Sequence, residues 1–404
     1  MENEPDQLAF QSLIKVRPAW TGIQRASDVL ELAERSILHA GPPFTLENEI
    51  PAPIANSAAV AIVYEGWAKN LTEATTLIQT GKIKFFPAQD KRVVTPMAAV
   101  ITPSMNLIEI SDLNDEASKI WTPINGGGTG GDPVPRYGKK SEAALSFLRH
   151  LNGEIAFGLE TIFQQPLEWY PIIDEALTKG DDGHLCHNAA HSILIREFSS
   201  SPNYKNINPE VRDFFEKWPF IHLNYWMACS KLALMSAEGF HESSLITHMG
   251  GNGSNFGIKV AGLPDRWFCY QASQPMGNIR EPFTIETTLG ALGDSAISEA
   301  FGTGAMALSF SERMQELHQG FYAQEDLSLP ELLLMGSHPK FCHSHLKVGL
   351  SANKVISTRS VPIVELGCID KYGDNGGLGA GIFKPPLKVF ENAVKALDKG
   401  QIRN

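Results

Sequence analysis

The sequence predicts an α+β protein, and three features of its 404 residues support this class. Strand and helix patterns alternate in the first third, apolar residues recur at helical spacing in the middle, and glycine-rich β-like segments fill the end. A chain of this length exceeds one ordinary hydrophobic core, so we expect several compact units. They are a mixed α/β domain over 1–138, a helical domain over 139–240 and a glycine-rich α+β domain over 241–404.

The N-terminal third is predicted to alternate between helix and strand. Asp28 with Glu31 predicts the start of a helix that runs to about Ile37. The short apolar run 58–63 predicts a buried strand. Further elements are expected in this third, namely a helix over 71–80 and strands over 83–87 and 107–110.

The middle third is predicted to be helical because one apolar stripe continues through it. Its members recur every three or four residues: Ala144, Leu148, Leu151, Ile155, Leu159 and Ile162. Similar patterns predict helices over 172–179, 183–198 and 209–238. From His241 onward glycines return, and β-like segments appear at 257–262 and 267–270.

Charge and cysteine content limit the function classes. The 45 acidic residues exceed the 34 basic residues, and the net charge of −11 argues against nucleic acid and anionic membrane as partners. The start of the chain is polar and acidic, and no apolar run approaches the ~18 residues of a membrane span. The five cysteines are scattered without a CxxC pair, as in reduced cytosolic proteins. We therefore expect a soluble, cytoplasmic protein.

Two glycine clusters are candidates for anion binding. The segment 126–131 is followed by Arg136, and the segment 376–381 leads through Lys384 into a helical pattern that reaches about Leu397. Glycine lets backbone N–H groups converge on a phosphate or carboxylate, and a helix start adds further donors. Two alternatives stay open, which are a flexible linker at the first cluster and close backbone packing at the second.

A histidine-rich segment is the clearest candidate for chemistry. Asp181, Asp182, His184, Cys186, His187 and His191 lie within eleven residues. On a helix the three histidines would share one face, which predicts either a metal site or an ordinary helix surface. His184 is also a candidate acid/base or hydrogen-bonding residue.

Two polar turns complete the set of motifs. Asn252-Gly253 is a strong hairpin signal, so a plain turn is the alternative to a binding role. The segment from Gly293 to Glu299 joins a turn to a predicted helix, where Asp294 would act as the N-cap. No nucleophile elbow accompanies them, so a Ser-His-Asp triad is not predicted.

Several blocks of sequence together resemble one family, the YlbE-like proteins. They are HAGPP at 39–43, EGWAK at 65–69, Gly180-Asp181 with His184, FGIKVAG at 256–262 with RWF at 266–268, GDSAISE at 293–299, FGTGA at 301–305 and LGAG at 378–381. The resemblance covers nearly the whole chain. It implies a subunit of an oxamate carbamoyltransferase system that acts with an FdrA-like subunit and a further small subunit.

The resemblance also implies a reaction and a set of site residues. Relatives interconvert oxalurate plus phosphate with oxamate plus carbamoyl phosphate in purine degradation. The catalytic residues implied are His184, Asp181, Lys69, Asp294 and Glu299. The substrate-binding residues implied are Glu65, Asn125, Gly127, Asn252, Gly253, Arg266, Lys371 and Gly379.

This chain departs from the family pattern at four places. Gly126 stands where relatives carry a glutamate, Cys186-His187 replace an Arg-Asn pair, Gly251 replaces an arginine, and Asp370-Lys371-Tyr372 replace a His-Lys-Glu string. Loss of two arginines weakens a bidentate grip on a substrate with two carboxylate-like ends. We therefore expect a related small amide or amino-acid-like acceptor at least as much as oxamate.

Three functional hypotheses follow. The first is a carbamoyl- or acyltransferase subunit that uses carbamoyl phosphate or phosphate, with an FdrA-like partner and a homodimer as the expected assembly. The second is a non-catalytic ligand-binding or scaffold subunit. The third is a metal-dependent amidohydrolase that uses His184, His187 and His191. We expect no nucleotide or flavin cofactor, and no metal is assigned among the site residues.

Overall fold

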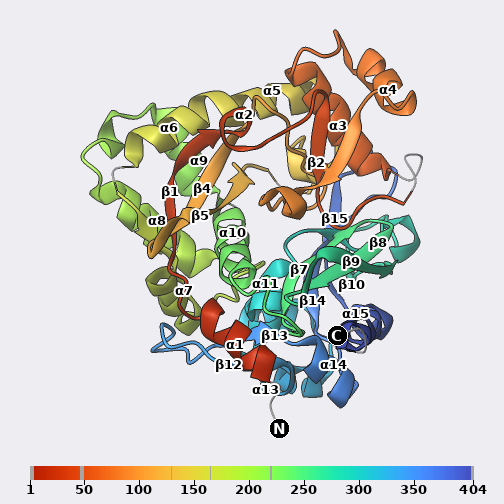
Figure 1. Cartoon of the computed structure of the whole chain (residues 1–404). Coiled ribbons are helices and arrows are strands. Elements are labelled where there is room, and N and C mark those ends of the chain that lie inside the picture. Colours follow the sequence, from red (N-terminus) through yellow and green to blue (C-terminus); the bar gives the residue numbers. More distant parts are fainter. Residues whose placement is uncertain (1–3, 46–49, 129, 164, 219–220, 402–404) are drawn as a thin grey trace.

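The computed structural model describes residues 4–45, 50–128, 130–163, 165–218 and 221–401 (Figure 1). Several small sheets, nearly all antiparallel, alternate with packed helices, which confirms the α+β class. Within these described ranges, no helix is long and apolar enough to cross a membrane. The predicted domain boundaries remain predictions, since one hydrophobic core includes residues from Ala9 to Leu397.

The first sheet contains four antiparallel strands drawn from distant parts of the chain. Their order is β5 (Asp115–Pro123), β4 (Asn106–Asp112), β1 (Pro18–Arg25) and β6 (Leu167–Glu168). Ile110 pairs with Trp20 on one side and with Ile120 on the other, and all three side chains are fully buried. A separate parallel pair joins β2 (Ser36–His39) to β3 (Lys84–Pro87). The strands predicted at 83–87 and 107–110 are confirmed.

The C-terminal part contains two further sheets and a hairpin-like pair. The four-stranded sheet has the order β11 (Leu292–Gly293), β7 (Ile246–Asn252), β8 (Asn255–Val260) and β9 (Leu263–Gln271). The three-stranded sheet has the order β10 (Met276–Ile279), β15 (Gly377–Phe383) and β14 (Val364–Ile369). The pair is β12 (Leu334–Ser337) with β13 (Lys347–Leu350).

Helix α10 connects these layers. The helices are α1 (Glu4–Leu13), α2 (Ala26–Val29), α3 (Ala52–Tyr64), α4 (Leu71–Gln79), α5 (Glu142–His150), α6 (Ala156–Ile162), α7 (Trp169–Thr178), α8 (Asn188–Ser200), α9 (Pro209–Lys217), α10 (Ile221–Met235), α11 (Ile297–Phe301), α12 (Glu312–Leu317), α13 (Leu329–Leu333), α14 (Ala352–Thr358) and α15 (Leu387–Gln401). All residues of α10 except Met235 are buried, because it packs against β4 and β5 on one side and β7 and α11 on the other (Figure 1).

Two predictions in the N-terminal third are wrong. The apolar run 58–63 belongs to helix α3, not to a strand. Alanine favours helix and Pro53 lies in the first turn, whereas a short apolar run has no period of its own. The helix expected from Asp28 to Ile37 ends at Val29, and Ile37 lies in β2 instead, where it is fully buried.

The helical prediction for the middle third is largely confirmed. Helices α5 and α6 carry the apolar stripe, joined by a π-helical turn over Leu151–Ile155. Helix α7 lies where its pattern predicts it, and the pattern over 209–238 corresponds to two helices, α9 and α10, because α9 ends at Lys217 and Trp218 is extended; residues 219–220 lie outside the described part. The prediction over 183–198 is wrong in its first turn, because α8 begins only at Asn188.

Candidate functional site

A cavity of about 700 Å³ lies between the glycine-rich loop, the three-stranded sheet and the turn that carries His184. Its wall includes Gly130 and Tyr137 on one side, His184 on a second side, and Arg280 beside β15 on a third. This volume is typical of sites for small organic ligands. The cavity is therefore the principal candidate for substrate binding.

Asp182 shapes the turn that presents His184. Its Oδ1 accepts hydrogen bonds from the backbone N–H groups of His184 at 2.6 Å and of Leu185 and Cys186 at 3.0 Å each. The preceding residue, Gly183, has a φ of +80°, which glycine adopts without strain. The sequence therefore forms a tight turn here, and His184 lies four residues ahead of helix α8.

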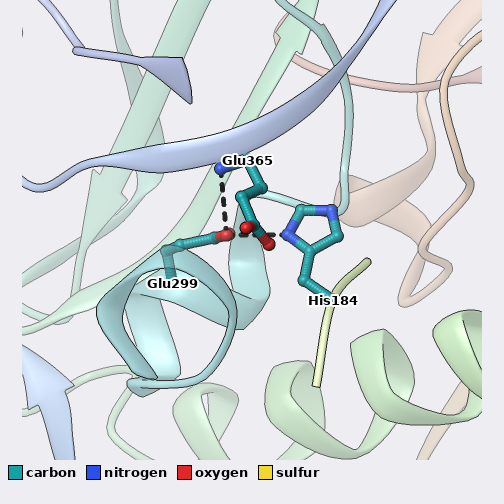
Figure 2. A group of neighbouring side chains, drawn as sticks. All are labelled: His184, Glu299 and Glu365. Atoms are coloured by element: carbon teal, nitrogen blue, oxygen red, sulfur yellow. Dashed lines mark hydrogen bonds and ion pairs between the residues drawn. The ribbon is translucent and has the colours of Figure 1, made fainter. Parts of the chain in front are cut away.

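His184 is anchored by Glu299, which α11 places directly behind it (Figure 2). His184 Nδ1 lies 2.7 Å from Glu299 Oε1, and that oxygen also accepts the backbone N–H groups of Ala305 at 3.1 Å and Glu365 at 3.2 Å. Burial disfavours the imidazolium, but the charges of Glu299, Glu365 and Asp182 outweigh it and raise the pKa of His184 to about 9. The other ring nitrogen, Nε2, points away from both glutamates (Figure 2).

Two further acids and a second histidine lie in this cluster. Burial raises the pKa of Glu365 to about 7 and that of Asp182 well above its ordinary value. His318 Nε2 lies 3.0 Å from Glu365 Oε1, and burial lowers the pKa of His318 to about 4. The region behind His184 is thus rich in carboxyl groups that water does not reach.

The first glycine cluster is held by a buried arginine. The guanidinium of Arg136, 1 % exposed, donates hydrogen bonds to the carbonyl oxygens of Gly126, Gly127 and Gly128 and to Asn125 Oδ1. These carbonyls therefore face a cation, and the loop is not a flexible linker at these positions. Gly130 and Gly131 line the cavity, while residue 129 lies outside the described part.

The remaining residues expected to be catalytic are not among those that line the cavity. Asp181 accepts the backbone N–H groups of Ala189 and Ala190 and so holds the start of α8. Asp294 is fully buried and accepts hydrogen bonds from the N–H groups of Gly41 and Thr95 and from Gln89 Nε2. Its carboxylate therefore joins three distant segments of the chain by hydrogen bonds, and it does not cap α11. Lys69 is exposed in the turn between α3 and α4.

Three of the residues expected to bind substrate stabilise turns. Both carboxylate oxygens of Glu65 accept hydrogen bonds at 2.8 Å from Ser104, one from its N–H and one from its hydroxyl. Asn252 Oδ1 accepts the N–H groups of Ser254 and Asn255, and Gly253 has a φ of +89°. The Asn-Gly pair therefore forms the hairpin between β7 and β8.

The last three residues expected to bind substrate lie in separate parts of the fold. Arg266 is exposed on β9, with its guanidinium carbon 4.9 Å from the centre of the Phe268 ring. Lys371 Nζ donates to the carbonyl oxygen of Glu286 at 2.7 Å. Gly379 lies in β15 and lines the cavity, where an added Cβ would meet Asn278 O at 1.9 Å. The second glycine cluster is thus largely a closely packed strand, and the helix predicted after it is α15, which begins at Leu387.

The structure separates His184 from the other two histidines of its segment. His187 precedes α8 and His191 lies within it, and both face His222 of α10, with ring centres 6.3 and 5.6 Å from the His222 ring. The single helical face predicted for His184, His187 and His191 is wrong, because the turn at Asp182 interrupts it.

Sequence reasoning overlooked Glu365, His318 and Arg280. Glu365 carried a usable signal, since an acid inside the apolar strand Val364–Ile369 is rarely buried without a purpose. No local pattern marks His318 or Arg280. Only the fold brings them near His184 and the cavity.

A family model and a curated relative identify one family. Residues 83–295 match the family model described as oxamate carbamoyltransferase subunit AllG. The oxamate carbamoyltransferase subunit AllG of Escherichia coli K12 is 27% identical over 96% of each chain. The uncharacterized protein YahG of the same strain is also 27% identical, over 96% of this chain and 84% of its own.

A solved structure matches the whole fold. The crystal structure of a conserved protein of unknown function from Enterococcus faecalis V583 superposes with a TM-score of 0.90 and 25% identity, and the match covers 98% of this chain and 97% of that one. The architecture that surrounds the cavity is therefore shared beyond this sequence.

Proposed function

Because the chain belongs to the AllG family of oxamate carbamoyltransferase subunits, we propose that it is a subunit of a carbamoyl-transfer enzyme and binds a small substrate in the cavity beside His184. The observation that carries this proposal is the placement of His184, which lines the cavity while Glu299 holds its Nδ1 at 2.7 Å. A histidine oriented in this way by a carboxylate is suited to hydrogen bonding or proton transfer at its other nitrogen.

The chemistry of carbamoyl transfer fits these groups. The nitrogen of an acceptor attacks the carbamoyl carbon, the bond from that carbon to a phosphate oxygen breaks, and the attacking nitrogen loses a proton. Such a reaction needs a donor for the charge that develops on the carbamoyl oxygen and a group that takes up the proton. His184 Nε2 is the candidate for one of these tasks.

Arg280 is the candidate anchor for the phosphate or carboxylate end of the substrate. Its side chain lies at the cavity wall and is braced by hydrogen bonds to the carbonyl oxygens of Gly377 and Asn375. A guanidinium can grip a planar or tetrahedral oxyanion with two N–H groups. Since the family arginines are absent near Cys186 and Gly251, we propose that the acceptor is a small amide or amino-acid-like molecule related to oxamate.

We further propose that activity requires an FdrA-like protein partner and that the chain forms a homodimer. The test is consumption of carbamoyl phosphate with oxamate and a panel of small amides and amines, with the chain alone and with an FdrA-like partner. We expect turnover with the partner, and we expect His184→Asn to lower kcat/KM by at least about 100-fold. His241→Asn, which changes an exposed histidine (74% side-chain exposure), is the matched control.

The outcomes separate the proposal from the scaffold alternative. Turnover that survives His184→Asn unchanged would contradict the role of the cavity. Binding of oxamate or carbamoyl phosphate by the chain, without turnover in either condition, would favour a ligand-binding subunit. A third variant, Arg280→Met, is expected to raise KM more than it lowers kcat, because it removes an anchor and not a reacting group.

A further inference from the structure

Three carboxyl groups surround the buried ring of His184, and their charges are not balanced by neighbouring cations. Asp182, Glu299 and Glu365 are each 0 % exposed. Four of their oxygens, which are Asp182 Oδ2, Glu299 Oε2 and both oxygens of Glu365, accept no hydrogen bond of standard geometry from the described residues, although the Asp182 side chain and the Leu185 N–H lie close to the Glu365 carboxyl group. His318 Nε2 lies 3.0 Å from Glu365 Oε1, but not in the orientation of a hydrogen bond.

Such a cluster requires neutralisation. A buried carboxylate without a partner is costly, and it persists only when a proton, a cationic side chain or a metal ion compensates it. His184 supplies at most one positive charge against three carboxyl groups. The shortfall indicates that either protons or a cation complete the cluster.

The geometry favours a cation. The ligand atoms of His184, Glu299 and Glu365 all lie within 4.8 Å of one another, and Figure 2 shows the three side chains converging on one point from a turn, a helix and a strand. Metal–ligand bonds of about 2.0–2.2 Å place neighbouring ligand atoms about 3 Å apart, so small side-chain shifts would close the shell. The backbone N–H groups already bound to Glu299 Oε1 and Asp182 Oδ1 hold the site in place.

We propose that His184, Glu299 and Glu365 bind one divalent transition-metal cation in the buried cluster behind His184. One imidazole nitrogen with two carboxylates suits Mn²⁺, Fe²⁺, Co²⁺ or Zn²⁺, since imidazole disfavours Mg²⁺ and Ca²⁺, which prefer oxygen ligands alone. Three protein ligands leave further coordination positions unfilled by these side chains. The ligand set differs from the predicted histidine face, because His187 and His191 take no part.

The proposed metal site is inferred from the contacts of these three residues alone, so it does not depend on whether the chain transfers a carbamoyl group. The experiment uses the full chain, stripped with a chelator and then dialysed against Mn²⁺, Co²⁺ or Zn²⁺, with bound metal measured by elemental analysis and affinity by calorimetry. We expect one equivalent per chain, and with Co²⁺ a visible absorption spectrum that is typical of mixed nitrogen and oxygen ligands.

Glu365→Gln keeps the size of the side chain and removes the charge, so we expect at least tenfold weaker metal binding. Glu109→Gln makes the same change at a glutamate that is 6% exposed and paired with Lys119, and we expect it to bind metal as the unmodified chain does. If Glu365→Gln does not fold, pulsed electron paramagnetic resonance of the unmodified chain with Cu²⁺ replaces it, with the signal of a coordinated imidazole as the expected result.

Less than about a tenth of an equivalent of metal on the folded chain would overturn the proposal. The same conclusion follows if binding is unchanged in Glu365→Gln, or if the Cu²⁺ spectrum lacks the imidazole signal. Protons shared among the carboxyl groups would then neutralise the cluster. Since metal binding is read without any turnover, a failure here is distinct from a failure of the carbamoyl-transfer proposal.

Discussion

Replacement of Arg136 by methionine should destabilise the chain and loosen one wall of the cavity. Arg136 is 1 % exposed, and its guanidinium donates to the carbonyl oxygens of Gly126 at 2.9 Å, Gly127 at 3.0 Å and Gly128 at 2.9 Å. Methionine has a similar length but no donor. The three carbonyl groups would therefore lose their partner, and the loop that continues into Gly130 and Gly131 would lose its anchor.

The size of the effect follows from two opposing contributions. Each hydrogen bond from a charged donor contributes roughly 1.5–3 kcal/mol. Against this, burial of the guanidinium is unfavourable, as the lowered pKa of Arg136 indicates, and its removal recovers several kcal/mol. Water from the adjacent cavity can also reach some of the carbonyls. We expect a net loss of about 3 kcal/mol in the free energy of unfolding, or about 100-fold in the folding equilibrium.

Urea unfolding monitored by tryptophan fluorescence measures this loss as a lower midpoint at an unchanged slope. Hydrogen exchange should report faster exchange over 125–138 and little change in α10. The matched control is Arg313→Met, which changes an exposed arginine on α12 and should remain within about 0.5 kcal/mol of the unmodified chain. A loss below about 1 kcal/mol for Arg136→Met would refute the reasoning, because the hydrogen bonds would then only balance the burial of the charge.

Three further predictions concern backbone, thiols and pH. Gly127→Ala should destabilise the chain by about 2 kcal/mol in urea unfolding, since φ is +64° and the new Cβ would lie 2.3 Å from the Phe147 ring. Gly131→Ala, with nothing within 4 Å of the added Cβ, should be nearly neutral, and equal losses would contradict the account. In the folded chain a thiol reagent should modify exposed Cys342 first and Cys186 slowly, because burial raises the pKa of the Cys186 thiol to about 11; Cys342→Ser should abolish the fast phase. Burial lowers the pKa of His39 to about 4, so between pH 6.5 and 5 the imidazole of His39 binds a proton in the unfolded chain but not in the folded chain. The free energy of unfolding should therefore fall by about 2 kcal/mol between pH 6.5 and 5. In His39→Phe the free energy of unfolding should no longer fall by this amount between pH 6.5 and 5, and an unchanged pH dependence would contradict the role of His39.

The sequence predicted those elements of the fold that carry a clear period. The stripe from Ala144 to Ile162 predicts its helices correctly, because it repeats over enough residues to define a helical period. The strand predicted over 107–110 is also correct, although this stretch is too short to define a period. The run 58–63 was assigned wrongly because it is apolar on every face. Helix α3 buries most of its residues, and a helix that is buried all round shows no polar side from which to read its period.

The sequence predicts only those members of the candidate site that lie within family motifs. His184 and Glu299 were both named from family motifs, and they meet at 2.7 Å although 115 residues separate them. Glu365, which completes the cluster, lies outside those motifs. Several motif residues, among them Asp294 and Glu65, bind backbone groups of distant loops. A motif therefore marks positions that the fold requires as well as positions that touch a ligand, and sequence alone does not separate the two.

The charge of the chain bears on how an anion could bind in this cavity. A net charge of −11 repels a phosphate or carboxylate at long range, so local groups must reverse the field. Arg280 supplies one positive charge at the cavity wall, but Asp182, Glu299 and Glu365 lie behind His184 and oppose it. A divalent cation held by Glu299, Glu365 and His184 would offset two of these negative charges. Metal binding and anion binding should then be coupled, and the affinity of the metal-loaded chain for carbamoyl phosphate should exceed that of the stripped chain by the same factor as carbamoyl phosphate strengthens metal binding.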